Sequence, residues 1–232
     1  MKRRTALLIV VAIVVVIVAA GIAYSFYFAQ QANAPREAPG VAVNCNPASS
    51  STDLRSFEIV PDKTTASYKV HENLIIRNLP STDAIGKTRD VHGTFRVSTK
   101  QAPQVATLHL TVNLSTLKTD EPRRDQYVRT QALETDTYPN AEFTSTCAAG
   151  LPVQYTDGQQ VSFQLPGNLT MHGKTNQETF AVTGKVSGNT ITGTASTSLF
   201  MTDFGIQPPN LANVAIAENK VVISIDLVAQ QK

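Results

Sequence analysis

The sequence predicts an all-β domain with one short helix, preceded by an N-terminal helix that spans a membrane. Three observations support this fold class. Apolar and polar residues alternate through the middle and end of the chain, glycine and asparagine separate the alternating stretches, and the chain begins with a long uncharged apolar run. We expect about eight to ten strands at a spacing of about 8–15 residues, which favours a barrel or sandwich over an α/β fold.

The first element is the apolar run at residues 6–28, which contains no charged residue. As a helix it would be about 34 Å long at about 1.5 Å per residue, enough to cross a hydrocarbon core of about 30 Å. Lys2, Arg3 and Arg4 precede it. The positive-inside rule then makes residues 1–29 a cytoplasmic start and anchor, with the rest of the chain extracytoplasmic. A signal peptide cleaved near residues 32–34 is the alternative, and it would leave a secreted or periplasmic protein.

A linker and a single domain follow this run. Residues 30–55 are rich in alanine, proline, asparagine and serine and lack hydrophobic periodicity, so we expect them to be flexible. Residues 56–232 suffice for one domain with its own core. The chain has a net charge of +2, and three of its basic residues lie at positions 2–4. The outer domain is therefore near neutral and lacks the basic patch of a nucleic-acid-binding protein.

The cysteines and histidines indicate a disulfide rather than a metal site. Cys45 and Cys147 are the two cysteines of the chain, and in an oxidising compartment they are a disulfide candidate. Their bridge would close a loop of about 100 residues and stabilise the fold by about 4–5 kcal/mol in the chain-entropy model. The four histidines lack the spacing of metal ligands, so we predict no metal. They are His71, His92, His109 and His172.

The strands are predicted by alternation with a period of two. Residues 105–115 and 220–229 show it most clearly, with leucine, valine and isoleucine on one face and polar residues on the other. This pattern is typical of half-buried antiparallel strands. Shorter alternating stretches occupy residues 67–70, 91–97, 161–165 and 179–186. Ser-Gly-Asn at 187–189 lies between two alternating stretches and predicts a tight hairpin.

One short helix interrupts the strands, from about Glu121 to Leu133. Asp120 precedes it and can cap it by accepting from the free N–H groups of the first turn. Pro122 suits that turn, because its missing N–H would have no intrahelical partner there. Pro139 disfavours helical backbone at the residue before it, so the helix must end upstream.

The polar stretch at residues 119–143 contains Arg123, Arg124 and Asp125 in succession. A catalytic site would need a base, a nucleophile or a metal within mutual reach, and the sequence contains no motif that supplies them. We therefore predict no enzymatic activity. The planar guanidinium fork matches carboxylates, so we expect one arginine to pair with Asp125 or with Asp203 on a later strand. That clasp would hold the helix over the end of the barrel, and a contact with a ligand head group is the alternative.

Four segments, taken in order, resemble the YceI-like family. They are "RRDQYVRTQALETDTYPNAEFTST" from Arg123, "LPGNLTMHGKTNQETFAV" from Leu165, "SLFMTDFGIQPPN" from Ser198 and "ENKVVISIDLVAQ" from Glu218. The resemblance covers about residues 56–230. It implies an eight-stranded antiparallel, lipocalin-like barrel with a helix that closes part of one end. It also implies a long-chain amphiphile inside, typically a polyisoprenoid, a location outside the cytoplasm and a homodimer.

The sequence and the resemblance together predict a membrane-tethered protein that binds, stores or transports such a lipid without chemistry and without a cofactor. A barrel of eight strands is wide enough for one small ligand, and it can also be filled by its own side chains. The alternative is therefore a solid-cored protein that scaffolds a membrane complex or responds to envelope stress. Alternation predicts these ligand-binding residues on the inner face: Tyr68, Val70, Phe95, Leu108, Leu110, Val112, Phe143, Phe163, Leu165, Phe180, Val182, Ile223 and Ile225.

Overall fold

The computed structural model describes residues 53–74, 81–99, 103–211 and 215–232. The predicted anchor, nearly all of the predicted linker and Cys45 lie outside these ranges. Within them, no helix combines the length and the apolar character needed to cross a membrane. The membrane anchor therefore stays a prediction.

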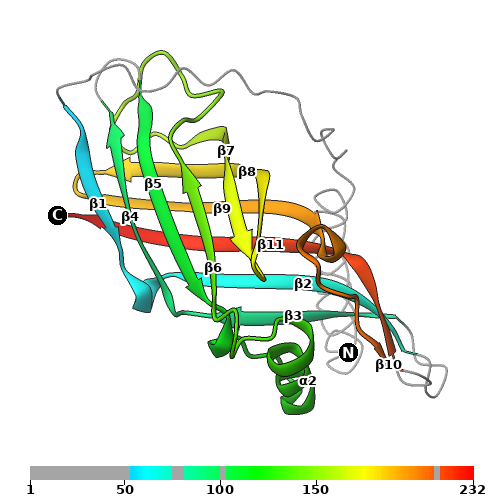
Figure 1. Ribbon diagram of the computed structural model, residues 1–232. Helices are drawn as coiled ribbons and strands as arrows, with labels where there is room; N and C mark the ends of the chain where they lie inside the picture. The colour runs from blue at the N-terminus through cyan, green and yellow to red at the C-terminus, as the bar shows by residue number, and fades with distance from the viewer. Residues whose placement is uncertain (1–52, 75–80, 100–102, 212–214) are drawn as a thin grey trace, which may run out of the picture. The chain divides into compact units, whose positions relative to one another are not determined.

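The described chain is built of antiparallel strands with one short α-helix, as predicted (Figure 1). The helix is α2, Pro122–Tyr127, and it continues as the π-helical turn η4, Val128–Ala132. Three short 3₁₀ turns are η1 (Pro61–Lys63), η3 (Leu114–Thr116) and η5 (Met201–Phe204). The strands are β1 (Arg55–Ile59), β2 (Thr65–Leu74), β3 (Thr82–Thr88), β4 (Val91–Ser98), β5 (Gln104–Asn113), β6 (Asn140–Ser145), β7 (Val161–Met171), β8 (Lys174–Ser187), β9 (Thr190–Phe200), β10 (Asn210–Leu211) and β11 (Ala215–Gln231).

Eight of these strands close into a barrel. The order around the sheet is β1-β4-β5-β6-β7-β8-β9-β11, and β11 pairs with β1 to complete the ring. The long strand β11 makes this closure possible, because its last residues pair with β1 while residues 215–226 pair with β2. β3 then pairs with β2. The predicted eight-stranded antiparallel barrel is confirmed.

An aromatic contact that alternation did not predict holds β1 against β4. β1 begins at Arg55, at the predicted end of the linker, and pairs with β4 as well as with β11. Phe57 of β1 is fully buried and stacks on Phe95 of β4, with ring centroids 5.8 Å apart. Burial of these two aromatic rings stabilises the pairing of β1 with β4.

The turns between the long strands use positive backbone φ angles. Ser187 pairs with Thr190, and Gly188 between them has φ = 57°, which confirms the hairpin predicted at 187–189. At the β7–β8 turn, His172 and Gly173 have φ values of 51° and 71°. Left-handed residues of this kind give a two-residue turn the twist that matches the flanking strands.

The N-cap of the helix lies one residue later than predicted. Glu121, not Asp120, is the N-cap, and its carboxylate accepts from the backbone N–H of Arg123 at 3.1 Å. Pro122 follows at the first helical position, as expected. Asp120 instead contacts the Arg124 side chain at 2.6 Å. The prediction of Asp120 as cap was wrong, because an ion pair engages its carboxylate.

Candidate functional site

A wide cavity of about 490 Å³ lies beneath the helical segment. Its walls come from β2, β5, β6, β7, β8, β9 and β11, and α2 and η4 contribute Arg123, Arg124, Tyr127, Val128 and Ala132. The helix therefore covers this end of the barrel interior, as the family resemblance implied. Four of the predicted ligand-binding residues line this cavity alone: Tyr68, Val70, Val112 and Ile223.

A narrow cavity of about 170 Å³ occupies the other part of the interior. Paired glycines, Gly184 of β8 and Gly193 of β9, lie in its wall, where a side chain on either would crowd the backbone of the partner strand. Five predicted residues line this cavity alone: Phe95, Leu108, Phe163, Leu165 and Val182. The lining is almost wholly apolar, which suits hydrocarbon.

The remaining four predicted residues, Leu110, Phe143, Phe180 and Ile225, line both cavities. The structure thus places all thirteen predicted ligand-binding residues along the interior. That they contact a ligand stays a prediction. They were found because side chains of a strand alternate between its two faces, and barrel closure turns one face of every strand inward.

Other lining residues were missed by sequence reasoning. Leu169 and Met171 of β7, Leu199 of β9 and Val221 of β11 are buried and line the wide cavity. Leu169 continues the alternation of Leu165, so period two could have found it. Val221 lies on the apolar face that alternation predicted for residues 220–229, but it was not among the predicted ligand-binding residues. Leu199 follows a run of serine and threonine residues, which hides its inward face in the sequence.

Charged residues gather where the wide cavity meets α2. Arg124 of α2 contacts Glu72 of β2 at 3.2 Å and Asp120 at 2.6 Å. The Glu72 side chain is 12% exposed and that of Arg124 is 22% exposed, whereas Asp120 is 88% exposed. Because Glu72 and Arg124 lie 52 residues apart, their contact fastens the helix to the barrel. The clasp therefore exists, but its partner is Glu72.

The predicted partners of the clasp have other contacts. The Asp125 carboxylate accepts from the backbone N–H and the hydroxyl of Thr119, both at 2.7 Å. It thereby holds the start of α2 to the preceding loop. Asp203 lies in η5, where its backbone carbonyl accepts from the Asn176 amide at 3.0 Å. Arg124 pairs with Glu72 and Asp120 rather than with the expected Asp125, because β2 brings Glu72 beside the helix. The expected pairing of an arginine with Asp203 stays a prediction.

The environment of this cluster raises the pKa values of two of its groups, Tyr68 and Arg124. Burial is the main cause that raises the pKa of the Tyr68 hydroxyl to about 12; the positive charge of Arg124 opposes the shift, and the negative charge of Asp125 adds to it. For Arg124, burial alone would lower the pKa, but the charge of Glu72 and the hydrogen bond to Asp120 outweigh it and raise the pKa. At neutral pH the cavity end therefore holds a neutral phenol and a permanent cation.

The histidines pair with separate carboxylates. His71 contacts Asp83 and His92 contacts Asp90, both at 2.9 Å. His109 lies 3.8 Å from Glu142, and the His172 ring lies 3.4 Å from Glu134. Among the described residues, no three histidine, cysteine or acidic side chains form a group that could hold a metal ion.

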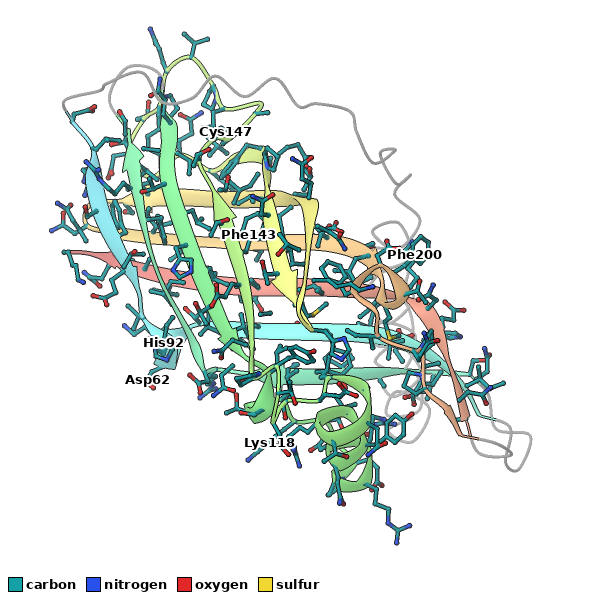
Figure 2. All side chains as sticks on the ribbon, in the orientation of Figure 1. Asp62, His92, Lys118, Phe143, Cys147 and Phe200 are labelled. Atoms are coloured by element: carbon teal, nitrogen blue, oxygen red, sulfur yellow. The ribbon has the colours of Figure 1, made fainter. Side chains whose placement is uncertain are left out.

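Cys147 lies just after β6 and is disulfide-bonded (Figure 2). Its predicted partner, Cys45, lies outside the described residues. The pairing of these two cysteines stays a prediction.

The closed barrel, its helical cover and its apolar interior are the features that the sequence resemblance implied. The model of the YceI-like domain family matches residues 57–229. This chain belongs to the YceI-like family. The match covers nearly all of the described barrel.

Relatives of this YceI-like chain agree with the assignment. It is 27% identical over 132 residues to a UPF0312 protein of Pseudomonas putida, a match that covers 51% of this chain and 65% of that relative. A polyisoprenoid binding domain from Saccharophagus degradans, described as implicated in plant cell wall breakdown, has a similar fold. Its TM-score is 0.58 at 16% identity, over 78% of this chain and 100% of that one. BcnA of Burkholderia cenocepacia gives a TM-score of 0.55 at 19% identity, over 74% and 99% of the two chains.

Proposed function

We propose that the barrel binds a long-chain amphiphile, such as a polyisoprenoid, inside its two cavities and carries or stores it without chemical change. The observation that carries this proposal is the wide cavity of about 490 Å³. Its volume lies within the range of about 300–1,000 Å³ that is typical of small-molecule sites. A protein interior normally packs to a density that leaves few voids larger than a water molecule.

The polarity of the interior supports an amphiphile rather than a plain hydrocarbon. Arg124, Glu72 and the Tyr68 hydroxyl lie at the α2 end of the wide cavity, and Arg123 is exposed at the same rim. The narrow cavity, by contrast, is almost wholly apolar. We infer that a head group lies near α2 and that the tail extends inward, where each buried CH₂ contributes about 0.8 kcal/mol at most.

The relatives support the same ligand class. The Saccharophagus degradans structure is a polyisoprenoid binding domain, and its fold likeness makes a similar ligand a reasonable proposal here. The interior does not favour the alternative, a solid-cored interaction protein, because such a barrel would fill these cavities with its own side chains.

We further propose that the barrel works outside the cytoplasm, tethered to the membrane through residues 6–28. A flexible linker of about 25 residues would reach about 25–30 Å on average. The barrel could then meet the membrane that supplies its ligand.

The test is native mass spectrometry of the full-length chain, exchanged from detergent into amphipol after incubation with a bacterial lipid extract. A parallel denatured sample is extracted with solvent to identify any released lipid. We expect a bound mass that extraction releases as a prenyl lipid. A clean apo mass would overturn the proposal and favour the solid-cored protein.

Two neighbouring residues of β11 provide a matched pair of variants. Ile223 lines the wide cavity, whereas Val222 faces the other side of the strand and lines neither cavity. We expect Ile223→Phe to lower lipid occupancy because the larger ring fills the cavity, and Val222→Phe to leave it unchanged. Equal occupancy in both variants would place the lipid outside the barrel.

A further inference from the structure

Four side chains are shared by the linings of the two cavities of the barrel. Leu110, Phe143, Phe180 and Ile225 line both the wide and the narrow cavity, so each has free space on two sides. They come from β5, β6, β8 and β11 respectively. In Figure 2, Phe143 lies between the end that carries α2 and the end near Cys147. The four shared side chains therefore lie within the barrel interior and not at its rim.

Phe143 and Phe180 are the aromatic members of this set. Their ring centroids are 4.8 Å apart and the rings meet edge to face at 64°. The strand between them, β7, pairs Leu169 with Phe143 and has Gly167 two residues earlier, beside the Phe143 ring. A side chain on Gly167 would overlap the Phe143 ring and the backbone oxygen of Thr144. The missing side chain of Gly167 thus lets the Phe143 ring lie against the wall and reach Phe180.

The volumes of the two cavities can be converted into the lengths of hydrocarbon chain that they hold. A dry cavity of about 150 Å³ holds one benzene molecule, which is roughly 25 Å³ per carbon atom. On that scale the wide cavity of about 490 Å³ holds about 20 carbons and the narrow cavity of about 170 Å³ holds about 7. In prenyl chains this is about four isoprene units before the rings and about one beyond them.

We propose that the Phe143–Phe180 pair is a gate that sets the chain length this barrel prefers, an inference that rests on the proposed function. Chains of up to about four isoprene units fill the wide cavity and leave the rings in contact. A fifth unit enters the narrow cavity only when the rings move apart. The free space on both sides of each ring provides the room for that movement.

The cost of opening the gate can be compared with the gain beyond it. Breaking an edge-to-face aromatic pair costs about a twofold to tenfold loss in affinity. One isoprene unit, with five carbons, gains about tenfold at the efficiency typical of drug-sized ligands. The fifth unit should therefore raise the affinity of the wild type by only about onefold to fivefold.

The test is a competition in one sample. Farnesol, geranylgeraniol and geranylfarnesol, which differ by one isoprene unit each, are added in equal amounts to the full-length chain in amphipol. Native mass spectrometry then reports the occupancy of each alcohol. Wild type should favour geranylgeraniol over farnesol by about tenfold and should discriminate weakly between geranylgeraniol and geranylfarnesol.

Four variants test the gate. Phe180→Ala should raise the preference for geranylfarnesol over geranylgeraniol to about tenfold, and the milder Phe180→Leu should change it in the same direction if the alanine variant folds poorly. Val182 lines the narrow cavity alone. Val182→Phe fills that cavity, so adding it to Phe180→Ala should abolish the gained preference. Val222 lines neither cavity, so Val222→Phe as a single change should leave the farnesol-to-geranylgeraniol ratio unaltered.

Two outcomes would overturn the gate, and they are distinguishable. If the wild type binds these alcohols but Phe180→Ala and Phe180→Leu keep its length preference, the rings do not set chain length and the proposed function still stands. If neither the wild type nor any variant binds an alcohol, the proposed function fails and the gate fails with it.

Discussion

Replacement of Arg124 by alanine tests the clasp between the helix and the barrel. The Arg124 guanidinium joins α2 to β2 through Glu72 at 3.2 Å and also contacts Asp120 at 2.6 Å. The alanine variant leaves the Glu72 carboxylate without this partner. Because that carboxylate is only 12% exposed, water replaces the lost contact poorly, and we expect the barrel to lose stability.

The size of the loss follows from the exposure of the pair. Exposed ion pairs contribute about 0–1 kcal/mol, whereas removing one partner of a fully buried pair costs about 3–5 kcal/mol. Glu72 and Arg124 are 12% and 22% exposed, which places Arg124→Ala between these limits, at about 2 kcal/mol. For a domain of this size each kcal/mol lowers the melting temperature by about 2–4 °C, so we expect a decrease of about 4–8 °C.

Arg123→Ala is the matched control. Arg123 is the neighbouring arginine on the same helix and is exposed, so its replacement should change the melting temperature by about 2 °C or less. Thermal unfolding followed by circular dichroism compares the two variants with the wild type. Equal melting temperatures for Arg123→Ala and Arg124→Ala would refute the clasp. A normal melting temperature together with weakened prenyl-alcohol binding in Arg124→Ala would instead identify a head-group contact.

Three further changes test the site. Burial raises the pKa of Tyr68 from 10.0 to about 12, so the stabilisation from its neutral phenol is present below pH 10 and is lost as the pH rises through 12. Between pH 10 and pH 12 the unfolding free energy of the wild type should fall by about 2–3 kcal/mol more than that of Tyr68→Phe. If urea titrations show the same difference in unfolding free energy between the two proteins at every pH, the prediction is contradicted. Asp125→Ala removes two hydrogen bonds from Thr119 and should cost about 1–3 kcal/mol in urea unfolding with prenyl-alcohol affinity kept; the opposite pattern would make Asp125 a head-group residue. Gly167→Ala should cost about 1–3 kcal/mol in the same assay, because the added methyl group overlaps the Phe143 ring, and wild-type stability would show that Phe143 can move freely.

The strands and turns were predictable because their signals are local. The alternation at residues 105–115 and 220–229 appears in the structure as β5 and β11, and the glycine at position 188 lies at the predicted hairpin. β1 and β3 were not singled out by alternation. β1 has five residues, of which only Phe57 and Ile59 are apolar, so its alternation is a weak signal.

The interior residues were predictable for the same reason, but their contacts were not. Alternation indicates which face of a strand is apolar, and closure of the barrel then turns that face inward. It does not indicate which side chains meet across the interior. The contact between Phe143 and Phe180 joins strands that are not neighbours in the sheet, and the contact between Glu72 and Arg124 joins residues 52 positions apart.

The sequence by itself determined an all-β chain, the position of its helix, its inward-facing residues and its resemblance to the YceI-like family, because each depends on periodicity or on motifs within short segments. Only the tertiary structure decided that the interior holds two cavities, that the Phe143 and Phe180 rings meet and line both of them, and that Glu72 contacts the helix through Arg124. These features depend on how side chains from strands distant in sequence fill, or fail to fill, the same space. Packing of that kind leaves no periodic trace in the chain.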